Sequence, residues 1–152
     1  MSGAPGCGKS TWINKQIEGN GGIHISRDVV RFNMIKDDEE YFSHETAVFN
    51  EFARQANAAI ANENGPDDIY IDATHLNQAS RNKILKKLVL DNVTVNVVFM
   101  RPTIETCIER NEKREGRSVV PRSALRRMWY QQTDPATDEF ASHYNQIIYV
   151  EE

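Results

Sequence analysis

The 152-residue sequence has little cysteine, no long hydrophobic run and no excess of positive charge. Its two cysteines, Cys7 and Cys107, are too few for a disulfide framework, and neither has zinc-type neighbours. No apolar run is longer than Val97–Met100, far short of the roughly 20 residues that a membrane-spanning helix needs. The chain opens without a charged and apolar leader, so we expect a cytoplasmic location and no membrane partner.

The balance of charge is acidic, with 18 Lys and Arg against 22 Asp and Glu and a net charge of -4. This balance argues against a broad electrostatic grip on nucleic acid, although a small basic pocket could still hold one strand end. Apolar residues make up 39% of the chain and are placed periodically, which excludes pure disorder. The length predicts a single domain over residues 1–152.

Predicted helices and strands alternate along the chain. We predict helices over residues 9–18, 27–34, 45–62 and 103–112, one capped by Asn77, and one from Pro121 through Gln132. We predict strands over residues 23–25, 69–72, 93–100 and 147–150. This alternation predicts an α/β fold, with a parallel sheet flanked by helices on both faces.

The strongest motif is the segment from Gly3 to Ser10, GAPGCGKS, which matches the Walker A pattern G-x-x-x-x-G-K-[ST] in full. Such a loop turns several backbone N–H groups toward a phosphate, and the helix that follows adds its positive dipole end. Lys9 supplies a cation to the phosphates, and the Ser10 hydroxyl suits the Mg²⁺ that accompanies ATP. The predicted ATP-binding residues here are Gly3, Ala4, Pro5, Gly6, Cys7, Gly8, Lys9, Ser10 and Thr11.

Only Met1 and Ser2 precede this loop, whereas a phosphate-binding loop normally follows a buried strand. We therefore expect a P-loop kinase-like sheet whose first strand is missing or truncated. The central place in the sheet would then be poorly filled.

Two acidic residues lie at or just after the ends of predicted strands, where the ligand crevice of an α/β sheet lies. Asp28 and Arg31 are three residues apart and share a helix face, so a carboxylate that can accept a proton lies beside a cation. A surface ion pair would have the same spacing, but the position after the second strand favours a function. Asp72 ends the strand over residues 69–72, and we predict that it joins Ser10 around Mg²⁺.

A basic stretch over residues 113–122 surrounds Gly116 and suits a mobile lid that closes over polyphosphate. A solvated charged face is the usual alternative for such a run. Arg110 and Arg114 are four residues apart on one helix face, so they are the predicted ATP-binding cations. The histidines, His24, His44, His75 and His143, form no metal-binding pair, and His75 is the one that we expect nearest the site.

Several segments together carry a family resemblance. They are Gly3–Trp12, Ser26–Arg31, Ile71–Asn77 with Arg81, Arg110–Arg114, Val119–Pro121 and Leu125–Met128. In order and spacing this set resembles the kinase domain of phage-type polynucleotide 5′-hydroxyl kinases, within the wider group of small P-loop kinases. The resemblance implies ATP-dependent transfer of the γ-phosphate to a 5′-hydroxyl end of RNA or DNA, as in nucleic acid repair.

The resemblance also implies roles for individual residues. Asp28 would take the proton from the 5′-hydroxyl, and Arg31 would contact a phosphate of the acceptor strand. Asp72 would help to order the site. Arg114 would clamp the ATP phosphates from the lid, with Arg110 in support, and Lys9 would act on the transferred phosphate.

Two other functions fit the same motifs. A P-loop kinase for a small hydroxyl compound, such as a sugar acid, a nucleoside or an antibiotic, fits the acidic balance of charge slightly better. A nucleotide-gated binding module that hydrolyses ATP slowly would use the loop and the lid without a phosphorylated acceptor.

Overall fold

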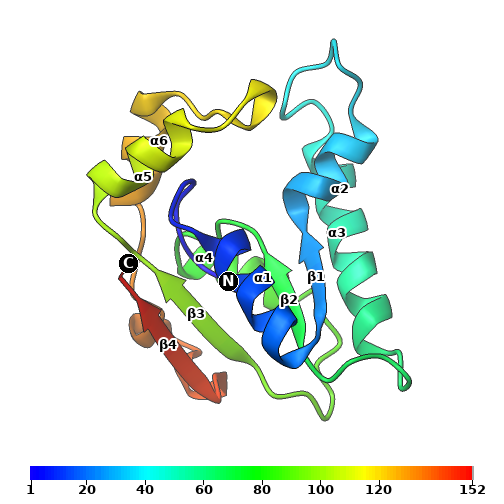
Figure 1. Cartoon of the computed structure of the whole chain (residues 1–152). Coiled ribbons are helices and arrows are strands. Elements are labelled where there is room, and N and C mark those ends of the chain that lie inside the picture. Colours follow the sequence, from blue (N-terminus) through cyan, green and yellow to red (C-terminus); the bar gives the residue numbers. More distant parts are fainter. Residues whose placement is uncertain (152) are drawn as a thin grey trace.

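The computed structural model describes residues 1–151. Helices and strands alternate along the chain, as predicted (Figure 1). The helices are α1 (Lys9–Asn20), α2 (Arg27–Met34), α3 (Glu45–Ile60), α4 (Gln78–Leu85), α5 (Ile104–Glu112) and α6 (Arg122–Tyr130). The strands are β1 (Ile23–Ser26), β2 (Ile69–Asp72), β3 (Asn96–Met100) and β4 (Gln146–Val150). Short 3-10 turns lie at η1 (Gly116–Ser118), η2 (Pro135–Thr137) and η3 (Ala141–His143).

The four strands form two parallel pairs. In the first pair β1 lies beside β2, and the register places Ser26 opposite Asp72 at the carboxyl end. In the second pair β3 lies beside β4, from Asn96 opposite Gln146 to Met100 opposite Val150. Because both pairs are parallel, each presents its strand ends, and the side chains that follow them, at one edge.

Residues Met1–Gly3 join the two pairs. Ser2 forms a parallel bridge with Phe99 on β3, and the Met1 amino group donates to the Ile71 carbonyl of β2 at 2.9 Å. These residues therefore lie in the central position between β2 and β3, immediately before the phosphate-binding loop. The fold is α/β and P-loop kinase-like, as predicted.

The central position is only partly filled by the described residues. A cavity of about 650 Å³ lies beside Met1 between β2 and β3, and its walls include Tyr70, Val95 and Ile148.

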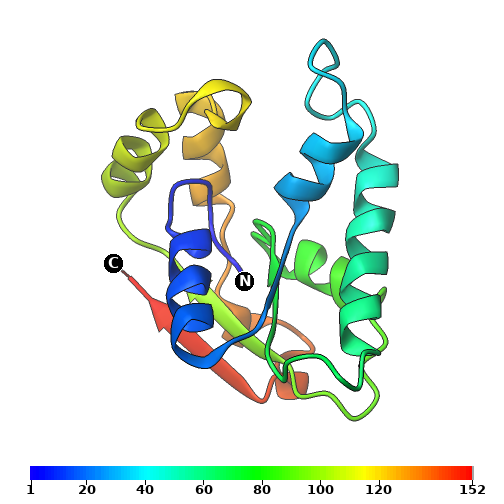
Figure 2. The same cartoon turned by 45° about the vertical axis from the view of Figure 1, so that its right-hand side comes forward.

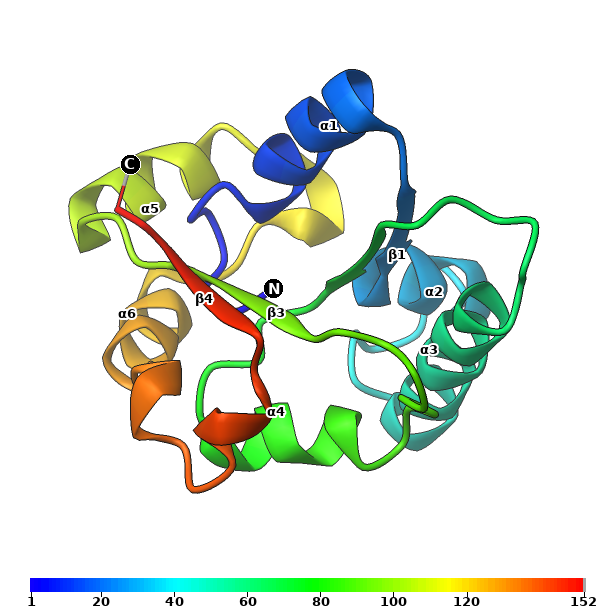
Figure 3. The ribbon, with the colours of Figure 1, turned by 90° about the horizontal axis from the view of Figure 1, so that it is seen from below.

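Helices cover both faces of the strands, with α1 and α4 on opposite sides (Figure 3). One buried cluster joins α2, α3 and α4 to the β1–β2 pair and is centred on Phe52, which is fully buried. A second cluster joins α5 and α6 to the β3–β4 pair and includes Cys107 and Leu125. No helix among residues 1–151 is both long and apolar enough to cross a membrane.

Polar side chains cap the helices that follow the strands. Ser26 accepts a hydrogen bond from the Val29 N–H and begins α2. Asn77 and Ser80 form a reciprocal capping box that begins α4, so the predicted cap is confirmed. Thr103 caps α5 from outside the helix, which begins one residue later than predicted. These caps fix where each helix leaves the crevice edge.

Some predicted boundaries are wrong. The predicted strand over residues 93–100 begins only at Asn96, and Val93 is 40% exposed in the preceding turn. The alternation of valines therefore extends beyond the part that pairs with β4. The helix expected to end at Gln132 ends at Tyr130, and Pro121 caps α6 instead of forming its first residue. Helix α3 ends at Ile60, two residues early.

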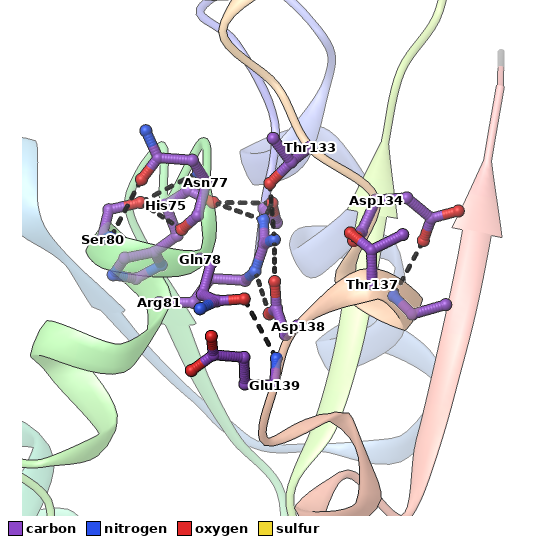
Figure 4. A network of polar contacts seen from close by, with 12 residues as sticks. His75, Asn77, Gln78, Ser80, Arg81, Thr133, Asp134, Thr137, Asp138 and Glu139 are labelled. Carbon is purple, nitrogen blue, oxygen red and sulfur yellow. Dashed lines mark hydrogen bonds and ion pairs between the residues drawn. The ribbon is translucent and has the colours of Figure 1, made fainter.

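A buried polar network connects distant segments behind the loop (Figure 4). Arg81 of α4 donates from Nε and Nη2 to the two carboxylate oxygens of Asp138, at 2.7 and 2.6 Å. Its remaining N–H groups reach Thr133 Oγ1, the His75 carbonyl and Ser2 Oγ. All five guanidinium donors are thus used, and the residue before Gly3 is fixed to the core.

Candidate functional site

The phosphate-binding loop stands at the same end of the molecule as α2 and the lid segment 113–122 (Figures 1 and 2). Gly8 caps α1 in a left-handed conformation, with a φ of 101°. A side chain at Gly6 would meet the Cys107 carbonyl oxygen, because a Cβ there would lie 2.3 Å from it. Gly8 therefore allows a left-handed turn, and Gly6, with a φ of 78°, allows both a left-handed turn and a close packing of the loop against α5.

The loop is held from behind as well. Gln132, which follows α6, accepts a hydrogen bond from the Ala4 N–H at 3.0 Å and donates to the Trp129 carbonyl. Arg110 of α5 donates to the Cys7 carbonyl at 3.3 Å. Arg110 thus lies against the loop, where the sequence places an ATP-binding cation.

Lys9 folds back over the loop that precedes it. Its Nζ donates to the Gly3 and Ala4 carbonyls, at 2.9 and 3.1 Å, and lies 3.6 Å from Cys7 Sγ. The ammonium group therefore lies over the concave side of the loop. Thr11, another predicted ATP-binding residue, is exposed on the first turn of α1.

Asp72 and Ser10 lie together, 62 residues apart in the chain. Ser10 Oγ donates to Asp72 Oδ2 at 3.0 Å, and His24 Nε2 lies 2.9 Å from the same oxygen. Burial alone raises the pKa of Asp72, but the His24 hydrogen bond, the Lys9 charge and the Ser10 hydrogen bond together lower it. The Asp72 carboxylate is therefore charged at neutral pH.

A hydroxyl and a carboxylate at this spacing fit Mg²⁺, which prefers oxygen ligands and usually takes only one or two carboxylates together with substrate phosphates. Within residues 1–151 no group of three or more His, Cys, Asp or Glu side chains is arranged to hold a metal. Ser10 and Asp72 would therefore hold the ion jointly with the nucleotide. When bound, the ion would neutralise charge on the phosphates.

Asp28 stands at the start of α2 with its side chain 60% exposed. Its Oδ1 accepts two hydrogen bonds, from Arg31 Nη1 at 2.5 Å and from the Tyr41 hydroxyl at 2.6 Å. Burial and the Asp28 charge both raise the pKa of Tyr41, so the phenol stays a donor. The carboxylate is held by one oxygen, and among the residues that the structure describes Oδ2 is left for a further partner.

Arg31 is buried, although the resemblance implies contact with an acceptor phosphate. Its Nη2 lies 3.0 Å from both carboxylate oxygens of Glu45, the first residue of α3. Arg27 pairs with the same carboxylate. Arg31 thus connects Asp28 to α3, and the predicted contact with an acceptor phosphate stays a prediction.

The segment predicted to act as a lid, residues 113–122, reaches from the end of α5 to the loop between α2 and α3. Asn111, at the end of α5, exchanges two hydrogen bonds with the Val120 backbone, at 2.8 and 3.0 Å, and so joins both ends of the segment. From its middle, Arg117 reaches Asp37 and the Glu39 carbonyl, on the loop between α2 and α3. Arg114 is exposed and contacts the Ser118 carbonyl, so the structure does not bring this predicted residue to the loop.

Sequence reasoning missed three contributors to this site, His24, Tyr41 and Glu45. His24 carried one usable signal, because it lies on the strand whose end pairs with the end of β2. His75, the histidine expected nearest the site, is instead buried behind it, with Nδ1 2.9 Å from the Met1 carbonyl. It belongs to the core side of the loop.

Burial lowers the pKa of His75 to about 3. The unfolded chain takes up a proton at this histidine as the pH falls below about 6.5, whereas the folded chain does not until about pH 3. We therefore expect the free energy of unfolding to fall with pH in this window, by at most about 1.4 kcal/mol per pH unit from this group. Urea denaturation between pH 7 and 4.5 measures the slope.

His75→Asn is the matched variant, because His75 has a φ of 38° and asparagine tolerates this conformation. The Met1 amine, Arg27 and Asp72 also face this imidazole and titrate or carry charge in both proteins. The difference between the two slopes therefore isolates His75. Equal slopes would show that the folded protein protonates this histidine normally.

Comparison with known protein families identifies the family of this chain. A family of AAA domains, AAA_33, matches residues 1–135, which is most of the chain. The chain belongs to this family. It is a P-loop kinase- or NTPase-type domain that uses ATP, and such domains generally use it with Mg²⁺. The comparison with curated proteins finds no match.

Proposed function

We propose that this AAA-family domain transfers the γ-phosphate of ATP to the 5′-hydroxyl end of RNA or DNA. The observation that carries the proposal is the Asp28 carboxylate, which is fixed by Arg31 and Tyr41 on the edge that also carries the phosphate-binding loop. Its exposure suits an acceptor that extends beyond the site, such as the end of a strand.

The loop residues bind and orient the nucleotide. The backbone N–H groups of Gly6, Gly8, Lys9 and Ser10, with the N-terminus of α1, attract the phosphates, because those of Gly3, Ala4 and Cys7 already donate within the protein. Lys9 leaves the carbonyls that it contacts here and moves its charge to the transferred phosphate, while Arg110 supports the loop from α5. Ser10 and Asp72 present oxygen atoms on the side where the phosphates lie. Arg114 would reach the phosphates only through movement of the lid.

Asp28 acts on the acceptor. Its free Oδ2 accepts the proton of the 5′-hydroxyl as the acceptor oxygen attacks the γ-phosphorus, and ADP leaves. Arg31 and Tyr41 keep Oδ1 in place, so that the carboxylate presents Oδ2 outward. Closure of the lid by Arg117 against the α2–α3 loop excludes water during transfer.

Transfer of labelled γ-phosphate from ATP to short 5′-hydroxyl RNA and DNA tests the proposal. We expect labelled oligonucleotide with the wild-type protein and a loss of about 10²–10³-fold in Lys9→Ala, because that variant lacks the cation on the transferred phosphate. Lys15→Ala, on the same helix, is the matched control and should retain transfer. ATP binding without labelled oligonucleotide, but with a labelled small hydroxyl compound, would replace this proposal with a small-molecule kinase.

Tyr41→Phe tests the positioning of Asp28. The variant keeps the aromatic ring, which packs edge-on to Phe32 and Phe42, but removes the hydroxyl that donates to Asp28. We expect kcat to fall by about tenfold with the KM for ATP unchanged, because one hydrogen bond to a charged group is lost. Steady-state kinetics over a range of pH measures this, and an unchanged kcat would leave the phenol with a structural role only.

A further inference from the structure

Phe42 is an exposed aromatic side chain on the loop between α2 and α3. Its side chain is 68% exposed, although burial of a phenylalanine ring is favourable. The ring lies edge-on to Tyr41, with 4.7 Å between centroids, and Tyr41 lies edge-on to Phe32 at 5.9 Å. The three rings form a row in which the outermost presents a large free surface to solvent.

This row lies beside the proposed acceptor site. The guanidinium carbon of Arg31 is 4.2 Å from the Tyr41 ring centre and 5.6 Å from the Phe42 ring centre. The same guanidinium donates a hydrogen bond to Asp28, which also accepts one from the Tyr41 hydroxyl. The Arg31 guanidinium and the Tyr41 side chain therefore each lie between Phe42 and Asp28, the proposed base.

A partly exposed cation lies at the other end of the row. The guanidinium of Arg117, from the lid, lies 5.6 Å from the Phe32 ring centre at the other end of the row. Cations beside exposed aromatic rings are the combination with which proteins hold single-stranded nucleic acid, because the bases stack on rings and the phosphates meet the cations. A small sugar acid has no aromatic face to place on Phe42.

We propose that Phe42 is a stacking platform for the 5′-terminal nucleobase of the acceptor strand. This inference rests on the proposed function and names how its substrate is held. Stacking on Phe42 places the terminal sugar toward Asp28, and Tyr41 supports the platform from its edge while it holds the carboxylate. Stacking alone tolerates all four bases, since each has a π-face.

The test crosses two protein variants with two substrates. The substrates are a short 5′-hydroxyl oligonucleotide and the same strand with an abasic sugar at its 5′ end. For the wild-type protein we expect the abasic end to raise KM about tenfold. Phe42→Ala should raise the KM for the normal strand by a similar factor, leave the abasic strand unaffected, and leave the KM for ATP unchanged. Phe42→Trp should restore the preference for the normal strand.

Tyr130→Ala is the matched control, because Tyr130 on α6 is also 68% exposed. It should change neither KM. An equal loss by Phe42→Ala on both strands, or no loss on either, would overturn the stacking platform while the wild-type transfer upholds the proposed function. Failure of the wild-type protein to label any oligonucleotide, although it binds ATP, would overturn the proposed function and the platform with it.

Discussion

Replacing Asp28 by asparagine is expected to reduce phosphoryl transfer by about 10³–10⁴-fold and to leave ATP affinity nearly unchanged. Asparagine has the size of aspartate and can keep an oxygen toward Arg31 and Tyr41. Its amide cannot take the proton from the 5′-hydroxyl of the substrate. The side chain is 60% exposed and lies outside the core, so the variant should fold normally. The loss therefore falls on the chemical step.

Single-turnover transfer to a 5′-hydroxyl oligonucleotide measures this loss, and nucleotide titration measures the affinity for ATP. Asp134→Asn is a matched control, because Asp134 is also an exposed carboxylate that accepts a hydrogen bond from a tyrosine hydroxyl, that of Tyr149 at 2.8 Å. That variant should transfer phosphate normally. Full activity of Asp28→Asn would assign the proton to another acceptor, and loss of ATP binding would show that Asp28 acts on the nucleotide.

The phosphate-binding loop could be predicted from the sequence because its shape is local. The left-handed turn at Gly8 and the start of α1 at Lys9 depend on residues within one short segment. Asp72 could be predicted because polar residues at the ends of buried strands face the crevice. Its contact with Ser10 needed only the common rule that parallel strands end at one edge.

The contacts that Tyr41 and Glu45 make with the Asp28–Arg31 pair could not be predicted in this way. Tyr41 follows α2 in a loop with no periodic pattern, and Glu45 begins the next helix. Their convergence on Arg31 depends on the angle at which α2 packs against α3, which no local signal specifies. The alternative prediction, a surface ion pair between Asp28 and Arg31, holds for Asp28, which is exposed, but not for Arg31, which is buried. The start of the strand predicted over residues 93–100 was wrong for a related reason. Alternation of apolar residues does not show where the neighbouring strand ends.

Replacing Arg81 by methionine is expected to lower the free energy of unfolding by about 3–5 kcal/mol. The ion pair with Asp138 is buried on both sides, with side-chain exposures of 4% and 0%. Methionine fills similar volume but, among residues 1–151, leaves the Asp138 carboxylate with only the Tyr144 hydroxyl as a side-chain donor. An uncompensated buried charge is costly, and Ser2 and Thr133 lose a donor as well. Urea denaturation at pH 7 measures the change.

Asp138→Asn placed in the Arg81→Met protein should recover part of the lost stability, because it removes the buried charge that the first substitution leaves unpaired. Arg54→Met is the contrasting control. Arg54 pairs with Glu51 at 2.7 Å on the solvent side of α3, and loss of such an exposed pair should leave the unfolding transition nearly unchanged. Equal effects of Arg81→Met and Arg54→Met would contradict the network. Arg81 donates to Ser2, which precedes Gly3 of the phosphate-binding loop. We therefore expect Arg81→Met to weaken ATP binding even at temperatures where the variant is folded. Unchanged ATP binding would show that Arg81 contributes to stability alone.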